Sequence, residues 1–178
     1  NNAVKAIAAV GASELYAAGD FATSGGSGIA RWNGSGWSVP GSGSFSGAAA
    51  VAATPSGSSY EAYVGYGTRL AHWWPNAGWR ARAPYPVVLQ DGAAAADDGA
   101  GHLYVMTGGT TNTFYRYDEA ANAWTARASL SGALAATGAL AWAQGYVYAL
   151  RALSAGGYGF YRYNPVASTW TTLSFPAA

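Results

Sequence analysis

The chain has 178 residues, no cysteine, and only 10% charged residues, where about a quarter is usual. Nine Lys and Arg against eight Asp and Glu give a formal net charge of +1, which excludes a strongly basic surface for nucleic acid or an acidic membrane. The absence of cysteine excludes a disulfide scaffold, a thiol nucleophile and a cysteine-ligated metal. The unusual feature that remains is an aromatic content of 15% together with 25 glycines.

A repeat that occurs four times organises the sequence. Each copy begins with an alanine-rich strand, continues with a strand that carries a tyrosine, and ends with a third strand, a short turn and a tryptophan. The alanine-rich strands are predicted at 4–10, 48–53, 93–96 and 138–143. The periodic tyrosines are Tyr16, Tyr63, Tyr104 and Tyr148. The third strands are predicted at 29–32, 70–73, 114–117 and 160–163, and the closing tryptophans are Trp37, Trp79, Trp124 and Trp170.

The segments between the third and fourth strands indicate tight hairpins. They are rich in Gly, Asn and Asp, which supply positive φ angles and side-chain-capped turns. No segment combines helical spacing of apolar residues with helix caps, so almost no helix is predicted. Each repeat is therefore expected to form four short antiparallel strands.

Four-stranded repeats of this length are typical of a β-propeller, since one such sheet is too small to bury both of its faces. The closing tryptophans are 42, 45 and 46 residues apart. We expect an all-β fold in a single propeller domain over 1–178, with blades at about 1–40, 41–86, 87–130 and 131–178. The predicted core between blades consists of Tyr16, Trp32, Trp37, Tyr63, Trp73, Trp79, Tyr104, Tyr117, Trp124, Tyr148, Tyr163 and Trp170.

The third repeat resembles the kelch repeat. It contains the double glycine Gly108-Gly109, then Tyr115-Arg116-Tyr117, then Trp124. The first repeat is similar to repeats of bacterial secreted and cell-surface propellers. This resemblance covers nearly the whole chain and implies a fold and an extracellular or cell-surface location, but no activity. The double glycine is replaced by Leu150-Arg151 in the last repeat, where a distorted second strand is expected.

Kelch propellers commonly close with six or seven blades, whereas this chain supplies four. Open end blades would expose apolar faces larger than a monomer normally shows. We therefore expect two chains to meet head to tail as a homodimer with eight blades. The alternatives are a closed four-bladed monomer, similar to hemopexin-like domains, and a four-bladed fragment of a larger secreted propeller enzyme.

The sequence predicts no cofactor, no metal and no catalytic activity. The two histidines, His72 and His102, lie in different repeats without further ligands at metal-binding spacing. Asp97-Asp98-Gly99 is interpreted as a hairpin turn rather than a cation loop. No phosphate loop leading to Lys and a helix, and no Gly-x-Ser-x-Gly motif, is present.

A cation recurs at one position of every repeat, and several other residues break the repeat. The recurring cations are Arg31, His72, Arg116 and Arg162. We favour an architectural role for them, by hydrogen bonding or by stacking on aromatic rings, over a ring of charge for an anionic ligand. Residues that break the repeat are candidate ligand contacts for a sugar or peptide. They are Arg69, Trp74, Arg80, Arg82, Trp142 and Arg151. Trp142 would equally fill a local gap near the axis.

Three functions remain open on the sequence alone. The first is a non-enzymatic propeller that recognises protein or glycan on its loop surface. The second is a self-assembling half-propeller scaffold. The third is an enzyme whose reactive groups lie outside this chain.

Overall fold

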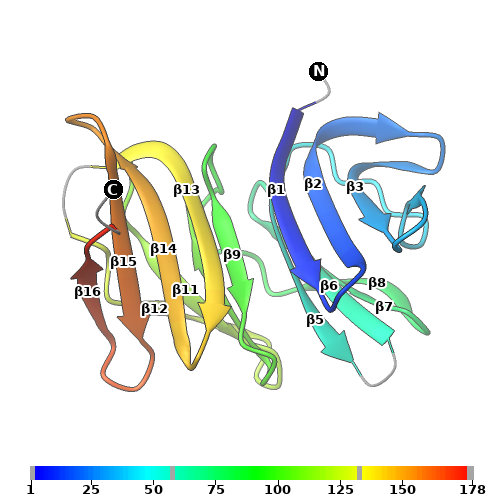
Figure 1. Cartoon of the computed structure of the whole chain (residues 1–178). Coiled ribbons are helices and arrows are strands. Elements are labelled where there is room, and N and C mark those ends of the chain that lie inside the picture. The colour runs from blue at the N-terminus through cyan, green and yellow to red at the C-terminus, as the bar shows by residue number, and fades with distance from the viewer. Residues whose placement is uncertain (1–2, 57–58, 132–133, 176–178) are drawn as a thin grey trace. The chain divides into compact units, whose positions relative to one another are not determined.

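The fold is all-β, as the repeat predicts. The structure is a computed structural model, and it describes residues 3–56, 59–131 and 134–175. In these ranges the chain forms sixteen strands and no helix. The strands make four antiparallel sheets of four strands each, and the strands follow chain order within every sheet. Figure 1 shows these sheets as the four blades expected for a propeller fold. Among the described residues, no helix is long and apolar enough to cross a membrane.

The strands of the four blades have the following bounds. Blade 1 contains β1 (Ala3–Val10), β2 (Glu14–Thr23), β3 (Gly26–Trp32) and β4 (Trp37–Ser38). Blade 2 contains β5 (Ala48–Ser56), β6 (Ser59–Tyr66), β7 (Arg69–Trp74) and β8 (Gly78–Arg82). Blade 3 contains β9 (Ala94–Asp97), β10 (His102–Met106), β11 (Phe114–Asp118) and β12 (Ala123–Arg127). Blade 4 contains β13 (Leu134–Ala143), β14 (Tyr146–Leu153), β15 (Tyr158–Asn164) and β16 (Thr169–Leu173).

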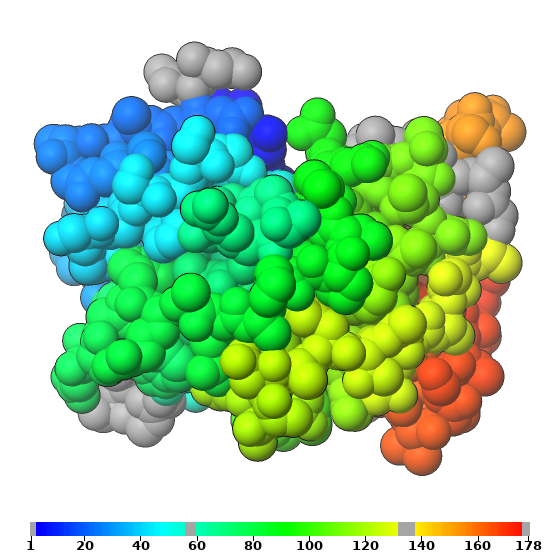
Figure 2. All heavy atoms as spheres, turned by 180° about the vertical axis from the view of Figure 1, so that it is seen from behind, coloured from blue at the N-terminus to red at the C-terminus, as the bar shows by residue number. Residues whose placement is uncertain are grey.

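The chain divides into two compact units of two blades each. Unit 1 is Asn1–Leu89 and unit 2 is Gln90–Ala178. In unit 1, strands β1 and β2 lie against β5, so blades 1 and 2 lie side by side, blue and cyan to green in Figure 2. In unit 2, β13 lies against β9 and β10.

Every blade has two different faces, because side chains alternate along a strand. The strand register places each periodic tyrosine directly opposite the recurring cation, as in Tyr16 opposite Arg31. The register also places Trp32 opposite the closing Trp37. We call the face that carries the periodic tyrosine and the recurring cation the tyrosine face of a blade. The face that carries the closing tryptophan is its tryptophan face. The same pairing recurs in the other three blades.

The two units are built around the same joint. In unit 1, Tyr16 on the tyrosine face of blade 1 lies 6.3 Å from Trp73 on the tryptophan face of blade 2, measured between ring centres. In unit 2, Phe114 on the tyrosine face of blade 3 lies 4.9 Å from Tyr163 on the tryptophan face of blade 4. Apolar clusters surround both contacts. A tyrosine face therefore packs against the tryptophan face of the next blade in both units.

The predicted distortion of the second strand in blade 4 is wrong. Strand β14 pairs with β15 without interruption, and the irregular register lies in the ladder of β13 with β14, between Leu134 and Gly138. Strand β14 accommodates Arg151 because its partner across the ladder is Gly138, which has no side chain. A Cβ atom at Gly138 would lie 2.6 Å from Cδ of Arg151, so the glycine leaves the space that the arginine stem occupies.

Candidate functional site

The residues predicted to contact a ligand are divided between the two units, and those of unit 1 lie on both faces of blade 2. Trp74, Arg80 and Arg82 lie on the tyrosine face of blade 2, around His72. Arg69 lies on the opposite face, with its guanidinium 5.9 Å from the centre of the Tyr66 ring. Trp142 and Arg151 belong to blade 4 in unit 2. Within unit 1, the sheet of blade 2 therefore separates Arg69 from the other three predicted residues.

Trp142 and Arg151 serve the joint between blades 3 and 4. The Trp142 ring stacks on Tyr104 with centres 5.7 Å apart and planes 9° apart, which is the gap-filling role. The Arg151 side chain is completely buried, and its Nη2 donates hydrogen bonds to the carbonyls of Gly109 and Thr111 at 3.2 and 3.5 Å. Burial lowers the pKa of Arg151. Both side chains therefore make packing or hydrogen-bond contacts within unit 2.

The recurring cations have partners that the sequence analysis overlooked. Arg31 donates from Nε and Nη2 to the two carboxylate oxygens of Glu14, at 2.6 and 2.7 Å. This pair raises the pKa of Arg31, chiefly through the Glu14 hydrogen bond. Arg162 instead lies over the ring of Tyr146, 4.5 Å from its centre. Glu14 and Tyr146 both stand two residues before a periodic tyrosine, and that spacing is a signal the sequence contains.

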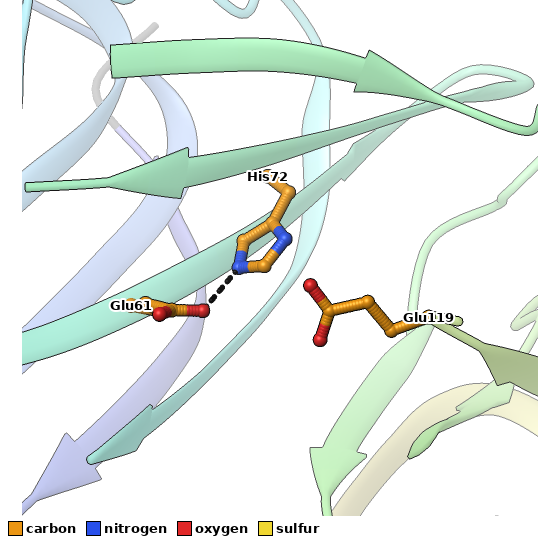
Figure 3. A group of neighbouring side chains, drawn as sticks. All are labelled: Glu61, His72 and Glu119. Atoms are coloured by element: carbon orange, nitrogen blue, oxygen red, sulfur yellow. Dashed lines mark hydrogen bonds and ion pairs between the residues drawn. The ribbon is translucent and has the colours of Figure 1, made fainter. Parts of the chain in front are cut away.

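His72 is the most enclosed of these positions. Its ring stacks on Tyr63 with centres 3.9 Å apart, and the Trp74 ring lies 3.7 Å away on centres. Burial first, and then the Arg82 charge, lower the pKa of His72 from 6.5 to about 3. The neutral ring therefore donates from Nε2 to the Glu61 carboxylate at 2.8 Å (Figure 3). Glu119, which Figure 3 also draws, belongs to unit 2.

A neutral His72 removes one charge from the recurring cation position. Arg31 and Arg162 are engaged by a carboxylate and an aromatic ring in their own blades. The recurring position therefore does not carry the same charge in every blade. The contacts of these residues are those of architectural groups.

We expect the neutral His72 to make the protein less stable in acid. The histidine is protonated below pH 6.5 in the unfolded chain, but only below about pH 3 in the folded one. Its contribution to stability is complete above pH 6.5 and is lost as the pH falls toward about 3, by up to about 1.4 kcal/mol per pH unit. Urea unfolding of the wild type and of His72→Gln at pH 7.5 and 4.5 measures this contribution. The stability difference between the two proteins should shrink by about 2 kcal/mol at the lower pH, and an unchanged difference would contradict a neutral buried ring.

The tryptophan face of blade 1 holds a groove that the sequence analysis did not predict. Its volume is about 360 Å³, and its lining includes Thr23, Ala30, Trp37 and Ser42. Trp37 is 57% exposed, and its ring lies 5.6 Å from that of Trp32 on centres. Trp37 is thus not enclosed in a core within unit 1, although Trp79 and Trp170 pack against the blade that precedes theirs.

The other residues of the predicted core have these positions. Tyr16, Tyr63, Trp73, Tyr104, Tyr117 and Tyr163 are buried. Trp32, Trp79, Trp124, Tyr148 and Trp170 are partly buried. The repeat therefore encloses most of its tyrosines more completely than its closing tryptophans.

Comparison with known proteins places this architecture in a family. The model of a family described as a repeat of unknown function (DUF6923) matches residues 80–178. The chain belongs to this family. The match covers both blades of unit 2, and unit 1 repeats the same blade joint. A search of curated protein sequences finds no match.

The fold of this chain resembles that of a solved structure. A structure described as "Structure of YjhT" is 15% identical to the chain, with a TM-score of 0.57. The likeness covers 72% of this chain and 51% of that protein, so the chain spans about half of its length. At this identity the likeness shows the fold alone.

Proposed function

We propose that this DUF6923 chain is a non-enzymatic scaffold that self-associates as half of an eight-bladed propeller. In this proposal the tyrosine face of blade 4 in one copy packs against the tryptophan face of blade 1 in a second copy. The single observation that carries it is the recurrence of one joint, tyrosine face on tryptophan face, in both units. A chain that ends in one face of each kind is suited to head-to-tail closure with a copy of itself.

Exposed apolar side chains on the two faces support this proposal. On the tryptophan face of blade 1, Ile7 is 65% exposed and Trp37 is 57% exposed. On the tyrosine face of blade 4, Leu150 is 39% exposed and Tyr158 is 60% exposed. Burying these exposed apolar side chains in a joint with a second copy would be favourable.

The remaining parts of the proposal rest on the sequence. The kelch-like pattern suggests a secreted or cell-surface protein of bacterial type, with protein or glycan recognised by the loops. A scaffold rather than an enzyme is favoured because the chain has two histidines and no cysteine, and because Trp142 and Arg151 are engaged in packing.

Light scattering coupled to size exclusion tests the self-association. We expect the purified chain to elute with twice its mass of 18.1 kDa. A stable particle of 18.1 kDa would overturn the proposal and favour a closed four-bladed monomer or a fragment of a larger propeller.

A further inference from the structure

The linker that leaves each blade carries one large apolar or aromatic side chain. Phe45 after blade 1, Tyr85 after blade 2 and Leu130 after blade 3 are all buried. Phe175 occupies the same place after blade 4, but it is 52% exposed and stacks only loosely on Phe160, with ring centres 6.0 Å apart. We call these four residues the linker plugs.

The structure shows how a plug and a closing tryptophan fit together. The Phe45 ring meets the Trp79 ring of the next blade edge to face, with centres 4.4 Å apart. The Trp79 indole also donates from Nε1 to the carbonyl of Pro40, in the linker that carries Phe45, at 2.6 Å. In unit 2 the Trp170 indole donates to the carbonyl of Ala128 at 2.7 Å, in the linker that carries Leu130. The plug and the indole hydrogen bond therefore occur together in both units.

Blade 1 presents the receiving half of the same fit. Trp37 is its closing tryptophan, and Trp37 lines the groove of about 360 Å³ together with Ala30. Ala30 has the position in blade 1 that Ala71 has in blade 2, because Ala30 precedes Trp32 by two residues as Ala71 precedes Trp73. Ala71 belongs to the cluster that contains Phe45. The groove thus corresponds to the place where a plug lies in the joint of unit 1.

We propose that Phe175 of one copy inserts into the Trp37 groove of a second copy. The Trp37 indole N–H of the second copy then donates to a backbone carbonyl in the 173–174 segment of the copy that supplies Phe175. This inference rests on the proposed self-association and adds the contact that closes it. The second copy is the chosen occupant because the chain carries both the exposed plug and the exposed groove.

Disulfide trapping tests the contact directly, since the chain has no native cysteine. Ser42→Cys places a thiol in the groove, and Ser174→Cys places one beside the plug. A mixture of the two single variants should give a covalent dimer on mild oxidation. Ser42→Cys mixed with Ala167→Cys, in the exposed turn after β15, is the matched control and should give none.

Two substitutions separate the plug from the hydrogen bond. Phe175→Ala should raise the dissociation constant of the dimer at least about tenfold, because it removes a buried aromatic ring. Trp37→Phe keeps an aromatic ring but removes the N–H, and should raise that constant about threefold to tenfold. Val166→Ala changes an apolar residue that is 97% exposed in blade 4, and should leave the constant unchanged.

The outcomes distinguish this contact from the self-association itself. A dimer that forms without the cross-link and is unaffected by Phe175→Ala overturns this inference and leaves the proposed function standing. A monomeric wild type overturns both. A disulfide that closes within a single chain when Ser42→Cys and Ser174→Cys are combined overturns the second copy as the occupant.

Discussion

Replacing Phe114 by alanine is expected to lower the free energy of unfolding by about 3–5 kcal/mol. Phe114 is 1% exposed, and its ring lies 4.9 Å from the rings of both Tyr163 and Trp170 on centres. Alanine would leave a cavity in the joint between blades 3 and 4, because the surrounding rings are fixed by other contacts. Urea denaturation followed by tryptophan fluorescence measures the loss.

Phe160→Ala is the matched control for Phe114→Ala. Phe160 has the same repeat position in blade 4, but it is only partly buried in the chain. Both substitutions are made in chains that carry Trp37→Ala, so that association with a second copy does not stabilise Phe160. We expect Phe160→Ala to cost less than half as much as Phe114→Ala. Equal losses would contradict the assignment of Phe114 to a blade joint.

Replacing Gly28 by alanine is expected to cost about 3 kcal/mol or more in stability. Gly28 has a φ of 80°, and a Cβ atom there would overlap the carbonyl oxygen of Phe45. The backbone of this linker is fixed, because the Phe45 N–H donates to the carbonyl of Ser27 at 2.8 Å. The clash would therefore displace the segment that carries the Phe45 plug. Thermal unfolding measures the effect.

Gly156→Ala separates the clash from the backbone strain. Gly156 has a φ of 93°, but nothing lies within 4 Å of its Cβ position. Alanine at Gly156 should cost only the strain of a positive φ, about 1–2 kcal/mol. If the two variants lose the same stability, the close approach of Phe45 to Gly28 is not a constraint on the fold.

The repeat predicted the fold because its signals are local. Each periodic tyrosine and closing tryptophan lies at a nearly constant position in its blade, and alternation along the strand places them on opposite faces. The linker plugs carry no such signal. Phe45 follows Trp37 by eight residues, Leu130 follows Trp124 by six, and Phe175 follows Trp170 by five. Because this spacing varies, a search for a repeat with fixed positions does not find the linker plugs.

Residues that break the repeat are the predicted ligand contacts, and two of them, Trp142 and Arg151, contact the neighbouring blade 3. Trp142 stacks on Tyr104 of the neighbouring blade, and Arg151 compensates for the missing side chain of Gly138. Such compensation involves two strands or two blades at once. A comparison of equivalent positions in the four repeats does not reveal such compensation. The Glu14 partner of Arg31 lies diagonally across two strands, so its role also depends on the register.

A mixing experiment with two disabled chains tests head-to-tail association most directly. Trp37→Ala disables the tryptophan face of blade 1, and Phe175→Ala disables the tyrosine face of blade 4, so each variant alone should dissociate at concentrations where the wild type is dimeric. A mixed pair retains one intact joint, formed by the blade 1 face of the Phe175→Ala chain and the blade 4 face of the Trp37→Ala chain. Sedimentation of the equimolar mixture should therefore show more dimer than either variant shows alone. If both variants alone are monomeric and their mixture is no heavier, head-to-tail closure through these two faces is contradicted.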